Sequence, residues 1–324
     1  MKNYNELLQF FNAELKNQKI NLKPNELYEP INYTLELGGK RIRPLLCLMA
    51  CEIFGTDAKQ AINQAIAIEF FHNFTLIHDD IMDNALLRRG KKSVYKKWNK
   101  NIAILSGDTL FALAYKYAQS YHPDQIHSIL SIFISTAIQV CEGQQYDLNF
   151  ENKKYISVND YLNMIQLKTA VLFGASLKIG AQIGGASESN AQNLYEFGIN
   201  IGIGFQLKDD LLDVYGDQNV FGKIKGGDII KNKKTYLYIK ALEIADEEQR
   251  KELILLYNSL NIDNNEKIQR VTNLYNQLGI KEIVNDFIQI HYKKGLENLE
   301  KLNVEENRLK DLKNLAQKMI VRKN

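Results

Sequence analysis

The scarcity of proline constrains the fold of this chain more than any other feature of its sequence. The chain has 324 residues, and its only prolines are Pro24, Pro30, Pro44 and Pro123. A proline inside a helix removes a hydrogen bond and clashes with the preceding turn, so proline-free sequence permits long helices. None of the 201 residues after Pro123 is proline. We therefore expect long helices over that part of the chain.

Hydrophobic residues recur at intervals of three and four, which is the period of an α-helix. One such run comprises Ile62, Ile66, Phe70, Phe74, Ile77 and Ile81. Alternating runs, which would indicate strands, are nearly absent. Hydrophobic residues make up 45% of the chain, enough for a large core, and no Ser/Gly-rich linker divides it. We predict an all-α fold in a single domain over residues 1–324.

Local signals mark where several helices begin and end. Gly38-Gly39 closes one predicted helix, and Pro44 lies in the first turn of the next. Ser157 and Asp160 have the spacing of a capping box, which predicts a helix start. The helical pattern then continues without a break toward Gly180.

Charge and composition exclude several classes of protein. Lys plus Arg number 41 and Asp plus Glu 38, and no block of like charges resembles a nucleic-acid-binding arm. We find no secretory leader pattern and no stretch of about 18 uncharged apolar residues that would predict a transmembrane segment. We expect a cytoplasmic protein. Cys47, Cys51 and Cys141 lack the partners of a zinc site, and we expect all three to be small buried hydrophobic residues.

Two clusters of aspartates share one spacing. The first acidic cluster, Asp79, Asp80 and Asp83, reads Asp-Asp-Ile-Met-Asp, and the second, Asp209, Asp210 and Asp213, reads Asp-Asp-Leu-Leu-Asp. On a helix the outer two acids of each cluster share a face, and the middle acid lies beside them. Like charges at this spacing repel, so we expect a cation to neutralise them. Carboxylates without His or Cys favour a hard ion, and we predict Mg²⁺.

A solvated acidic helix surface is the alternative interpretation of each cluster. However, hydrophobic residues fill the positions between the acids and flank them, including Phe74 and Ile77 before the first cluster and Phe205 and Leu207 before the second. Such surroundings favour an internal cleft over an exposed surface.

Basic residues stand where an anion bound to such a metal would need them. They are Lys40, Arg41 and Arg43 at a helix start, Arg88-Arg89 after the first cluster, and Lys223, Lys225, Lys231, Lys233 and Lys234 after the second. Arginine offers phosphate a bidentate fork, and Mg²⁺ commonly binds carboxylates and substrate phosphates together. Taken alone, the lysines after the second cluster are more typical of a solvated loop. No Gly-x-x-x-x-Gly-Lys-Ser/Thr loop is present, which argues against a nucleotide-binding kinase or ATPase.

The motifs together resemble those of the trans-isoprenyl diphosphate synthases, or polyprenyl synthetases. The matching stretches are Gly38–Pro44, Leu76–Asp83 with Arg88–Gly90, Gly143-Gln144 with Asp147, Lys168-Thr169, and Phe205–Asp213 with Gly222-Lys223. They follow the order of the family. The resemblance implies a helical bundle around a central cavity, with the two acidic clusters facing each other across its mouth. It also implies small-molecule diphosphate substrates and a homodimer.

The resemblance implies a role for each matching residue. Mg²⁺, about three ions per active site, would bridge Asp79, Asp83 and Asp209 to the allylic diphosphate, with Asp80, Asp210 and Asp213 completing or orienting that shell. The allylic substrate would contact Arg88, Lys168, Gln206, Lys223 and Lys233, with Thr169 beside the reacting carbon. Isopentenyl diphosphate would bind Lys40, Arg43, His72 and Arg89. From the residues alone, His72 is better interpreted as a core histidine.

The resemblance also bears on product length. In the family a bulky residue five positions before the first acidic cluster limits growth to short chains, and Phe74 occupies that position, with Phe71 and Thr75 nearby. Because Thr75 is not a second aromatic residue, we expect geranylgeranyl diphosphate rather than farnesyl diphosphate. Two alternatives remain, a terpene cyclase of the same fold and a non-catalytic regulatory homologue.

Overall fold

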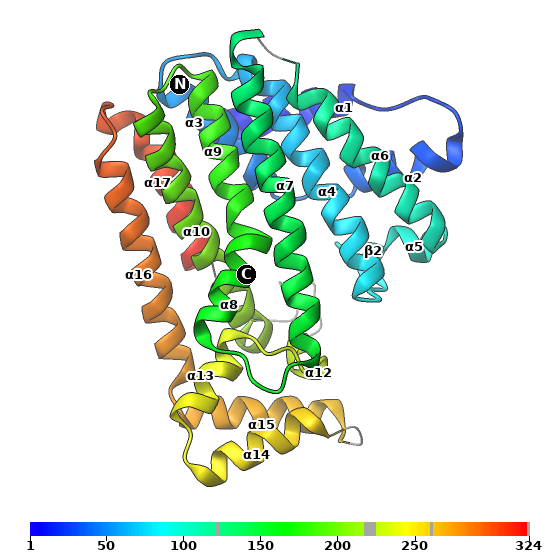
Figure 1. The fold of residues 1–324 in the computed structure, drawn as a ribbon, viewed down its shortest axis with the longest axis vertical. Coiled ribbons are helices and arrows are strands. Elements are labelled where there is room, and N and C mark those ends of the chain that lie inside the picture. Colours follow the sequence, from blue (N-terminus) through cyan, green and yellow to red (C-terminus); the bar gives the residue numbers. More distant parts are fainter. Residues whose placement is uncertain (121–122, 217–224, 260–261, 323–324) are drawn as a thin grey trace. The chain divides into compact units, whose positions relative to one another are not determined.

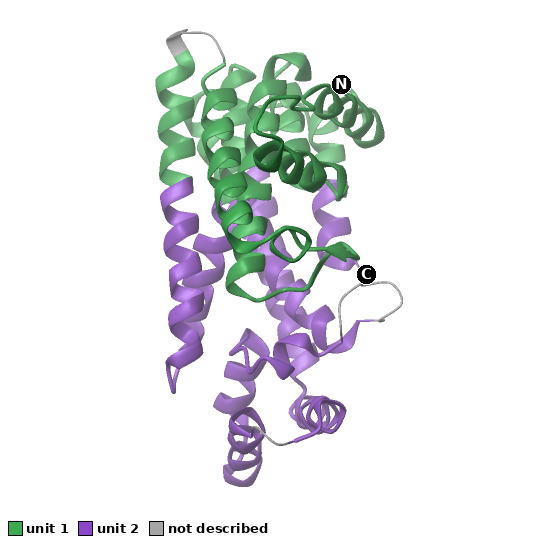
Figure 2. Ribbon diagram, turned by 90° about the vertical axis from the view of Figure 1, so that its right-hand side faces the viewer, with its two compact units in different colours: residues 1–136, 172–195, 301–312 green, residues 137–171, 196–300, 313–324 purple. Residues whose placement is uncertain are grey.

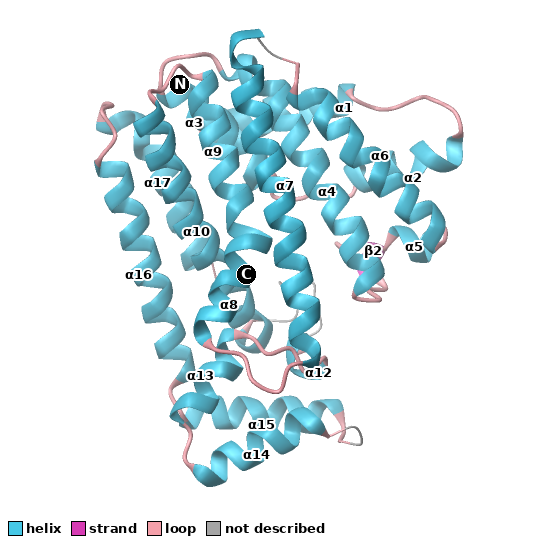
Figure 3. Ribbon diagram, viewed as in Figure 1, coloured by secondary structure: helices cyan, strands magenta, loops and turns pink. Residues whose placement is uncertain are grey.

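The computed structural model describes residues 1–120, 123–216, 225–259 and 262–322. Most of these residues are helical (Figures 1 and 3), which confirms the predicted all-α fold. In this part of the chain the strands are β1 (Leu87–Arg88) and β2 (Lys91–Lys92), which form a short antiparallel hairpin. Contacts divide the chain into two compact units (Figure 2), so the predicted single domain over residues 1–324 stays a prediction.

Unit 1 comprises residues 1–136, 172–195 and 301–312. Its elements are α1 (Tyr4–Asn17), α2 (Asn25–Glu36), α3 (Ile42–Ile53), the 3-10 turn η1 (Ala58–Ala61), α4 (Ile62–Met82), the hairpin, α5 (Val94–Lys97) and α6 (Lys100–Ala118). The boundaries between the units fall inside α7 (Pro123–Asn152), α9 (Val171–Ile183), α10 (Glu188–Tyr215) and α17 (Glu306–Val321).

The core of unit 1 is built around α4, which packs along α6 (Figure 1) and also against α3. Aromatic side chains join α4 to α6 and to α7. Phe71 lies 5.6 Å from Phe133 and 6.0 Å from Phe111 between ring centroids. A close approach of α3 to α9 requires glycine, because a Cβ on Gly180 would lie 2.0 Å from the carbonyl oxygen of Cys47.

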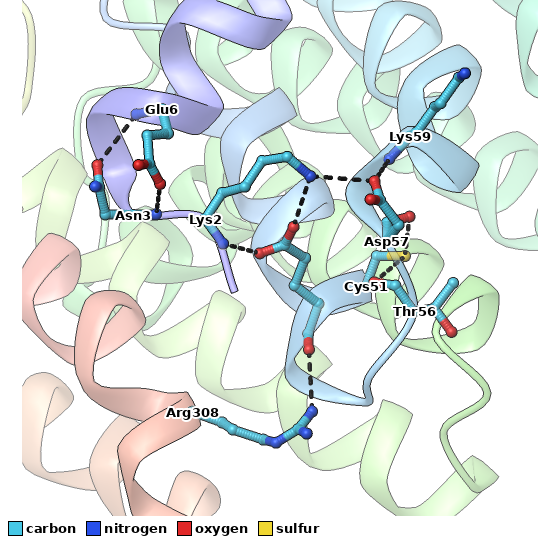
Figure 4. Close-up of polar contacts among 9 residues, drawn as sticks. Lys2, Asn3, Glu6, Cys51, Thr56, Asp57, Lys59 and Arg308 are labelled. Carbon is cyan, nitrogen blue, oxygen red and sulfur yellow. Dashed lines mark hydrogen bonds and ion pairs between the residues drawn. The ribbon is translucent and has the colours of Figure 1, made fainter.

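The end of α3 is tied to two segments that are distant in the sequence (Figure 4). Lys2 donates to the Glu52 carboxylate from its backbone N–H, at 2.6 Å, and from its side chain, at 3.3 Å. The same Lys2 ammonium contacts Asp57 at 3.2 Å. Arg308 donates to the backbone carbonyl of Glu52 and also to that of Ile53, the last residue of the helix. These bonds satisfy carbonyl groups that a helix end leaves without partners.

Unit 2 comprises residues 137–171, 196–300 and 313–324. Besides its parts of the shared helices it contains α8 (Val158–Ile165), the π-helical turn η2 (Gln166–Ala170), α12 (Gly227–Ile230), α13 (Tyr236–Ile244), α14 (Glu247–Asn258), α15 (Asn264–Gln277) and α16 (Ile280–Glu300). Its core includes Tyr236 stacked on Phe287 at 5.1 Å, and a hydrogen bond of 2.9 Å between the hydroxyls of Tyr257 and Tyr275.

Helix signals in the sequence are reproduced, with one difference. Ser157 caps α8 in a capping box with Asp160, as predicted. Pro44 is the third residue of α3, also as predicted. The expected unbroken helix toward Gly180 instead contains η2. A single π-turn inserts one extra residue into the helical ladder without ending it, so the hydrophobic pattern does not reveal it.

Helix α7 presents part of its apolar surface to solvent. Ile138 is 55% exposed, and Cys141 three residues later is exposed too, so the prediction that all three cysteines are buried was wrong for Cys141. Cys141 shares the exposed face of α7 with Ile138, whereas Cys47 and Cys51 are buried. In the described part of the chain, residues Gln125–Asn152 are long and apolar enough to cross a membrane. One such helix also fits a helix that packs against protein, so the absence of a transmembrane segment stays a prediction.

Candidate active site

The first acidic cluster lies at the end of α4. Asp79 and Asp80 belong to its last turn, and Asp83 caps it, its backbone N–H donating to the Asp79 carbonyl at 2.8 Å. Asp80 is only 3% exposed, whereas Asp79 and Asp83 are partly exposed. One acid of the cluster is therefore buried, and the outer two remain accessible to a ligand.

Arg88 holds the buried acid of the first cluster. Its Nε and Nη2 atoms lie 3.0 and 2.5 Å from Oδ1 of Asp80. Burial would lower the pKa of Arg88, but the bond to Asp80 and the nearby charges of Asp79 and Asp83 raise it. Arg88 is fixed by the β1–β2 hairpin, where it pairs with Lys91.

The hairpin turn places Arg89 beside the loop before α3. Arg89 and Gly90 form the two-residue turn, and both have positive φ, 52° and 74°, as the tight hairpin turns require. The Arg89 guanidinium donates to the carbonyl of Gly38. A Cβ on Gly39 would lie 2.8 Å from the guanidinium carbon, so glycine is needed for this approach.

Arg43 and His72 meet between α3 and α4. Nη1 of Arg43 lies 3.3 Å from Nε2 of His72, and the guanidinium lies 4.6 Å from the ring centroid of Phe173. Burial lowers the pKa of Arg43 to about 10. Burial, together with the charges of Arg43 and Arg89, holds the pKa of His72 well below its ordinary value. His72 is therefore neutral at pH 7, and arginines supply the positive charge here.

Two further basic residues near this loop have different surroundings. Lys40 is exposed, in the loop before α3. Arg41 is buried in an ion pair with Glu69 and donates to the Leu35 carbonyl at 2.7 Å. Asn73 donates to Oε1 of the same Glu69 at 2.9 Å. Arg41 thus has internal partners that account for its burial, and its neighbour Lys40 is the accessible cation.

The predicted chain-length residues lie in an aromatic cluster on α4. Phe71 is buried, and Phe74 is partly exposed. The Phe74 ring lies 4.9 Å from Phe111 and 4.8 Å from the imidazole of His78. Thr75 turns its hydroxyl to the backbone carbonyl of His72 at 2.8 Å. Their influence on product length stays a prediction.

The second acidic cluster lies in the last two turns of α10. Asp210 is buried and accepts hydrogen bonds from the Tyr161 hydroxyl and, at 3.0 Å, from the Gln206 amide. Burial, together with the nearby charge of Asp228, raises the pKa of Asp210 to about 8, although its two hydrogen bonds act in the opposite direction. The middle acid of this cluster therefore has neutral hydrogen-bond partners.

The π-turn η2 places Lys168 and Thr169 next to this cluster. The Thr169 hydroxyl donates to Oε1 of Gln206 at 3.1 Å. The Lys168 ammonium lies 2.6 Å from Oδ2 of Asp147 on α7. A Cβ on Gly143 would lie 2.2 Å from the Lys168 backbone nitrogen, which explains the glycine there. Thr169, Gln206 and Asp210 form one connected chain of hydrogen bonds, and the roles predicted for them stay predictions.

The third acid of the second cluster organises the following loop. Oδ2 of Asp213 accepts the backbone N–H of Asp228 at 3.0 Å, and its carbonyl accepts that of Gly226 at 2.7 Å. Asp228 was not among the predicted site residues, although its charge raises the pKa of Asp210. The signal that could have found it is its position directly after Gly226-Gly227, close behind the second cluster.

The loop after α12 carries Lys233. Its backbone N–H donates to the Asp228 carbonyl at 2.9 Å. Burial alone would raise the pKa of Asp147, but Lys168 and Lys233 hold it below its ordinary value. Lys223 lies outside the described residues. The buried Lys267 of α15 donates to the side chain of Asn232, a contact that nothing in the local sequence indicated.

Asp209 has a partner from a distant part of the sequence. Nη2 of Arg322, just after α17, lies 3.0 Å from Oδ1 of Asp209. The guanidinium carbon lies 4.1 Å from the ring centroid of Phe205. Arg322 was not among the predicted site residues, because its distance in sequence from the second acidic cluster matches no motif.

Comparison with known proteins identifies the family. The family model for polyprenyl synthetase matches residues 24–278. The chain belongs to the polyprenyl synthetase family. The geranylgeranyl diphosphate synthase of Methanosarcina mazei is 42% identical to this synthetase over 223 residues, which cover 68% of this chain and 69% of the relative. A short chain isoprenyl diphosphate synthase of Methanocaldococcus jannaschii is 40% identical over 256 residues, covering 79% and 77% of the two chains.

Solved structures give the same family. The crystal structure of a geranylgeranyl pyrophosphate synthase matches this synthetase with a TM-score of 0.96 and 44% identity, and the match covers 100% of both chains. The geranylgeranyl pyrophosphate synthetase of Pyrococcus horikoshii matches with a TM-score of 0.91 and 34% identity, covering 98% of this chain and 99% of the other. The predicted family and fold class are confirmed.

The carboxylates of this synthetase suit a magnesium ion that is shared with a substrate. Within the described ranges, no three His, Cys, Asp or Glu side chains converge to form a complete metal site. Mg²⁺ does not need such a site, because it usually keeps several waters and binds one or two carboxylates plus substrate phosphates. The partly exposed Asp79, Asp83 and Asp209 are oxygen donors of this kind. The metal ligands remain a prediction.

Proposed function

We propose that this polyprenyl synthetase is a short-chain trans-prenyltransferase. It condenses isopentenyl diphosphate with dimethylallyl, geranyl or farnesyl diphosphate and releases diphosphate. The observation that carries the proposal is the acidic cluster that each unit has at the end of a helix. In each cluster one acid is bound by an arginine: Asp80 by Arg88 and Asp209 by Arg322. The relatives described above are named for the same class of reaction.

Residues around both acidic clusters bind the allylic substrate. Asp79, Asp83 and Asp209, with Asp213 completing or orienting that set, would hold Mg²⁺, which would supply positive charge for the departing diphosphate when bound. Arg88, Lys168 and Lys233 bind the oxygens of that diphosphate, and we assign the same role to Lys223 from the resemblance to the family. Their fixed charges stabilise the leaving group, so the allylic carbon–oxygen bond breaks with both electrons going to oxygen.

The hydrogen-bonded residues Thr169, Gln206 and Asp210 stabilise the allylic cation that ionisation creates. The Thr169 hydroxyl is oriented by Gln206, and Gln206 by Asp210. The hydrogen bonds orient the dipoles of these groups before the reaction begins. Their oxygen atoms can therefore stabilise an allylic cation without reorganisation. The double bond of isopentenyl diphosphate then attacks the cation, and a proton leaves, with the released diphosphate as the base. Water must be excluded, since it would trap the cation.

Isopentenyl diphosphate is the ligand that we assign to Lys40, Arg43, His72 and Arg89. Arg43 and Arg89 supply fixed positive charge, and His72 acts as a neutral hydrogen-bonding group that orients Arg43. Because the guanidinium has several donors in one plane, Arg43 can keep its bond to His72 and still face a diphosphate. This assignment predicts that Arg43 and Arg89 affect the KM for isopentenyl diphosphate more than that for the allylic substrate.

The product that we propose is geranylgeranyl diphosphate, with farnesyl diphosphate as the shorter alternative. Phe74 is held between Phe111 and His78 on the helix that ends in the first acidic cluster. A ring held by two neighbours cannot turn aside easily, so it can set a fixed limit to the growing chain. The small Thr75 beside it leaves room that a second aromatic residue would fill.

One incubation tests the reaction and the product together. Purified protein, Mg²⁺, isopentenyl diphosphate and each allylic starter should yield inorganic diphosphate and a linear all-trans product of twenty carbons by mass spectrometry. Phe74→Ala should lengthen the product, whereas Phe10→Ala, on α1, should leave it unchanged. A cyclic hydrocarbon would support a terpene cyclase, and no turnover with any starter would support a non-catalytic homologue. Unchanged length in Phe74→Ala would remove Phe74 from its role.

A homodimer is the assembly that we propose. Apolar residues lie exposed on two long helices, with Ile104 and Leu105 on α6 and Ile134 and Ile138 on α7. Large apolar side chains gathered at a surface commonly mark a protein interface. Light scattering should give twice the mass of one chain, and Ile138→Lys should shift it toward the monomer. A monomeric wild-type protein would contradict the proposal. A cytoplasmic location stays a prediction.

A further inference from the structure

Arg322 and Asp209 form an ion pair at the candidate metal site. The pair joins the end of α17 to α10, and both residues belong to unit 2. The Arg322 side chain is 11% exposed and that of Asp209 is 26% exposed. The Arg322 side chain is therefore largely shielded from water, whereas Asp209 keeps part of its surface accessible.

The position of Arg322 is fixed by more than this pair. Its guanidinium stacks on Phe205, one turn before Asp209, and Nη2 also lies 3.5 Å from the Phe205 carbonyl. The buried Nε of Arg322 has no hydrogen-bond partner in the described part of the chain. The guanidinium thus keeps its place by stacking, by one charged contact and by the long contact to the Phe205 carbonyl, while its Nε donor is unused. Such a cation can leave the carboxylate at a smaller cost than a fully bonded one.

The surroundings of Arg322 are rich in positive charge. Lys208 directly precedes Asp209 on α10. A dication that bound Asp209 would lie about 2 Å from its oxygen, while Nη2 of Arg322 lies 3.0 Å from the same residue. The two like charges would repel each other strongly at that separation.

We propose that Arg322 is a positioning residue that competes with divalent metal for Asp209. In the metal-free enzyme it orients the carboxylate and neutralises its charge. A divalent ion must displace the guanidinium, so metal alone binds weakly. A diphosphate gives the displaced guanidinium an anion to pair with, and metal and diphosphate therefore bind together better than either alone. This inference rests on the proposed function, because it assumes that Asp209 is a metal ligand.

The test measures metal binding without turnover. Mn²⁺ replaces Mg²⁺, and its affinity for the full-length protein is measured by electron paramagnetic resonance or calorimetry, with and without inorganic diphosphate. Arg322→Met keeps the aliphatic stem on Phe205 and removes the charge, so it should bind Mn²⁺ alone about fivefold to tenfold more tightly than wild type. Adding diphosphate should reduce this difference. Arg322→Lys should stay close to wild type.

Two controls isolate the pair. Lys318→Met removes the same charge from the last turn of α17, where Lys318 is exposed, and should leave the affinity unchanged. In an Asp209→Asn background, Arg322→Met should have no further effect. Circular dichroism checks the fold, and Arg322→Gln repeats the test with a polar side chain if Arg322→Met does not fold.

The outcomes separate this inference from the proposed function. Equal or weaker Mn²⁺ binding by the folded Arg322→Met or Arg322→Gln variant overturns the competition, while the metal site stands. Absence of Mn²⁺ binding by wild type, with and without diphosphate, overturns the metal site and the competition with it.

Discussion

The two acidic clusters have the same spacing and different electrostatics. The middle acid of the first, Asp80, is paired with the guanidinium of Arg88, whereas that of the second, Asp210, is bound by a phenol and an amide. A permanent cation is bound to Asp80, whereas burial and the nearby charge of Asp228 raise the pKa of Asp210 to about 8, against the effect of its two neutral hydrogen-bond partners. A shared sequence pattern therefore fixes where the acids lie on a helix but not their charge state, which depends on partners from elsewhere in the chain.

The outer acids of the clusters differ as well. Asp83 caps α4 and stays partly exposed, but its counterpart Asp213 is buried and accepts the backbone N–H of Asp228. Asp209 contacts Arg322, a residue 113 positions away. The first cluster thus offers two accessible carboxylates on one helix face, and the second offers one that is already held by a cation.

The largest expected effect comes from the accessible acids. Asp79→Ala and Asp209→Ala should each lower kcat about a thousandfold or more, because both carboxylates act on the transition state through the metal. The exposed Asp286→Ala serves as the control and should leave kcat unchanged. If only one of the two variants lost activity, the clusters would not share one substrate diphosphate.

An intermediate effect is expected from the middle acids, and it falls on stability. Asp80→Asn leaves the Arg88 guanidinium without its counter-ion and should cost about 1–3 kcal/mol in the free energy of unfolding. Asp210→Asn should cost less than about 1 kcal/mol, since the phenol and amide can reorient to meet an amide. Urea denaturation of the metal-free proteins measures both. Equal losses would contradict the comparison.

The smallest effect concerns pH and lies beside the first cluster. The pKa of His72 is held well below 6.5, so below that pH the unfolded chain binds a proton that the folded chain does not. Stability should therefore fall as the pH drops below about 6.5, by at most about 1.4 kcal/mol per pH unit. His72→Gln should flatten this slope, and the exposed His127→Gln should not. Parallel slopes in all three proteins would show that His72 is protonated in the fold.

The sequence predicts the helical fold and the positions of both clusters because these depend on local periodicity and spacing. The capping box at Ser157 and the placement of Pro44 are local features too, and both are found. The hairpin that carries Arg88 was not predicted, since two-residue strands are too short to show alternation.

The hydrogen-bond and ion-pair partners of the acids could not be predicted from local sequence patterns. Tyr161 on Asp210 and Arg322 on Asp209 join residues far apart in the chain, and so does the contact of Lys267 with Asn232 outside the clusters. No pattern in one sequence reports such contacts, because they arise when helices pack. The exposed Cys141 has the same origin, since burial of a helix face depends on which neighbour covers it.

The central claim is that both acidic clusters bind the same diphosphate through shared metal. Crystals grown with Mn²⁺ and an unreactive allylic thiodiphosphate, measured at the manganese absorption edge, test it most directly. We predict anomalous peaks around one diphosphate, with carboxylate oxygens of Asp79, Asp83 and Asp209 as ligands. Peaks at one cluster only, or none beside the diphosphate, would contradict the account.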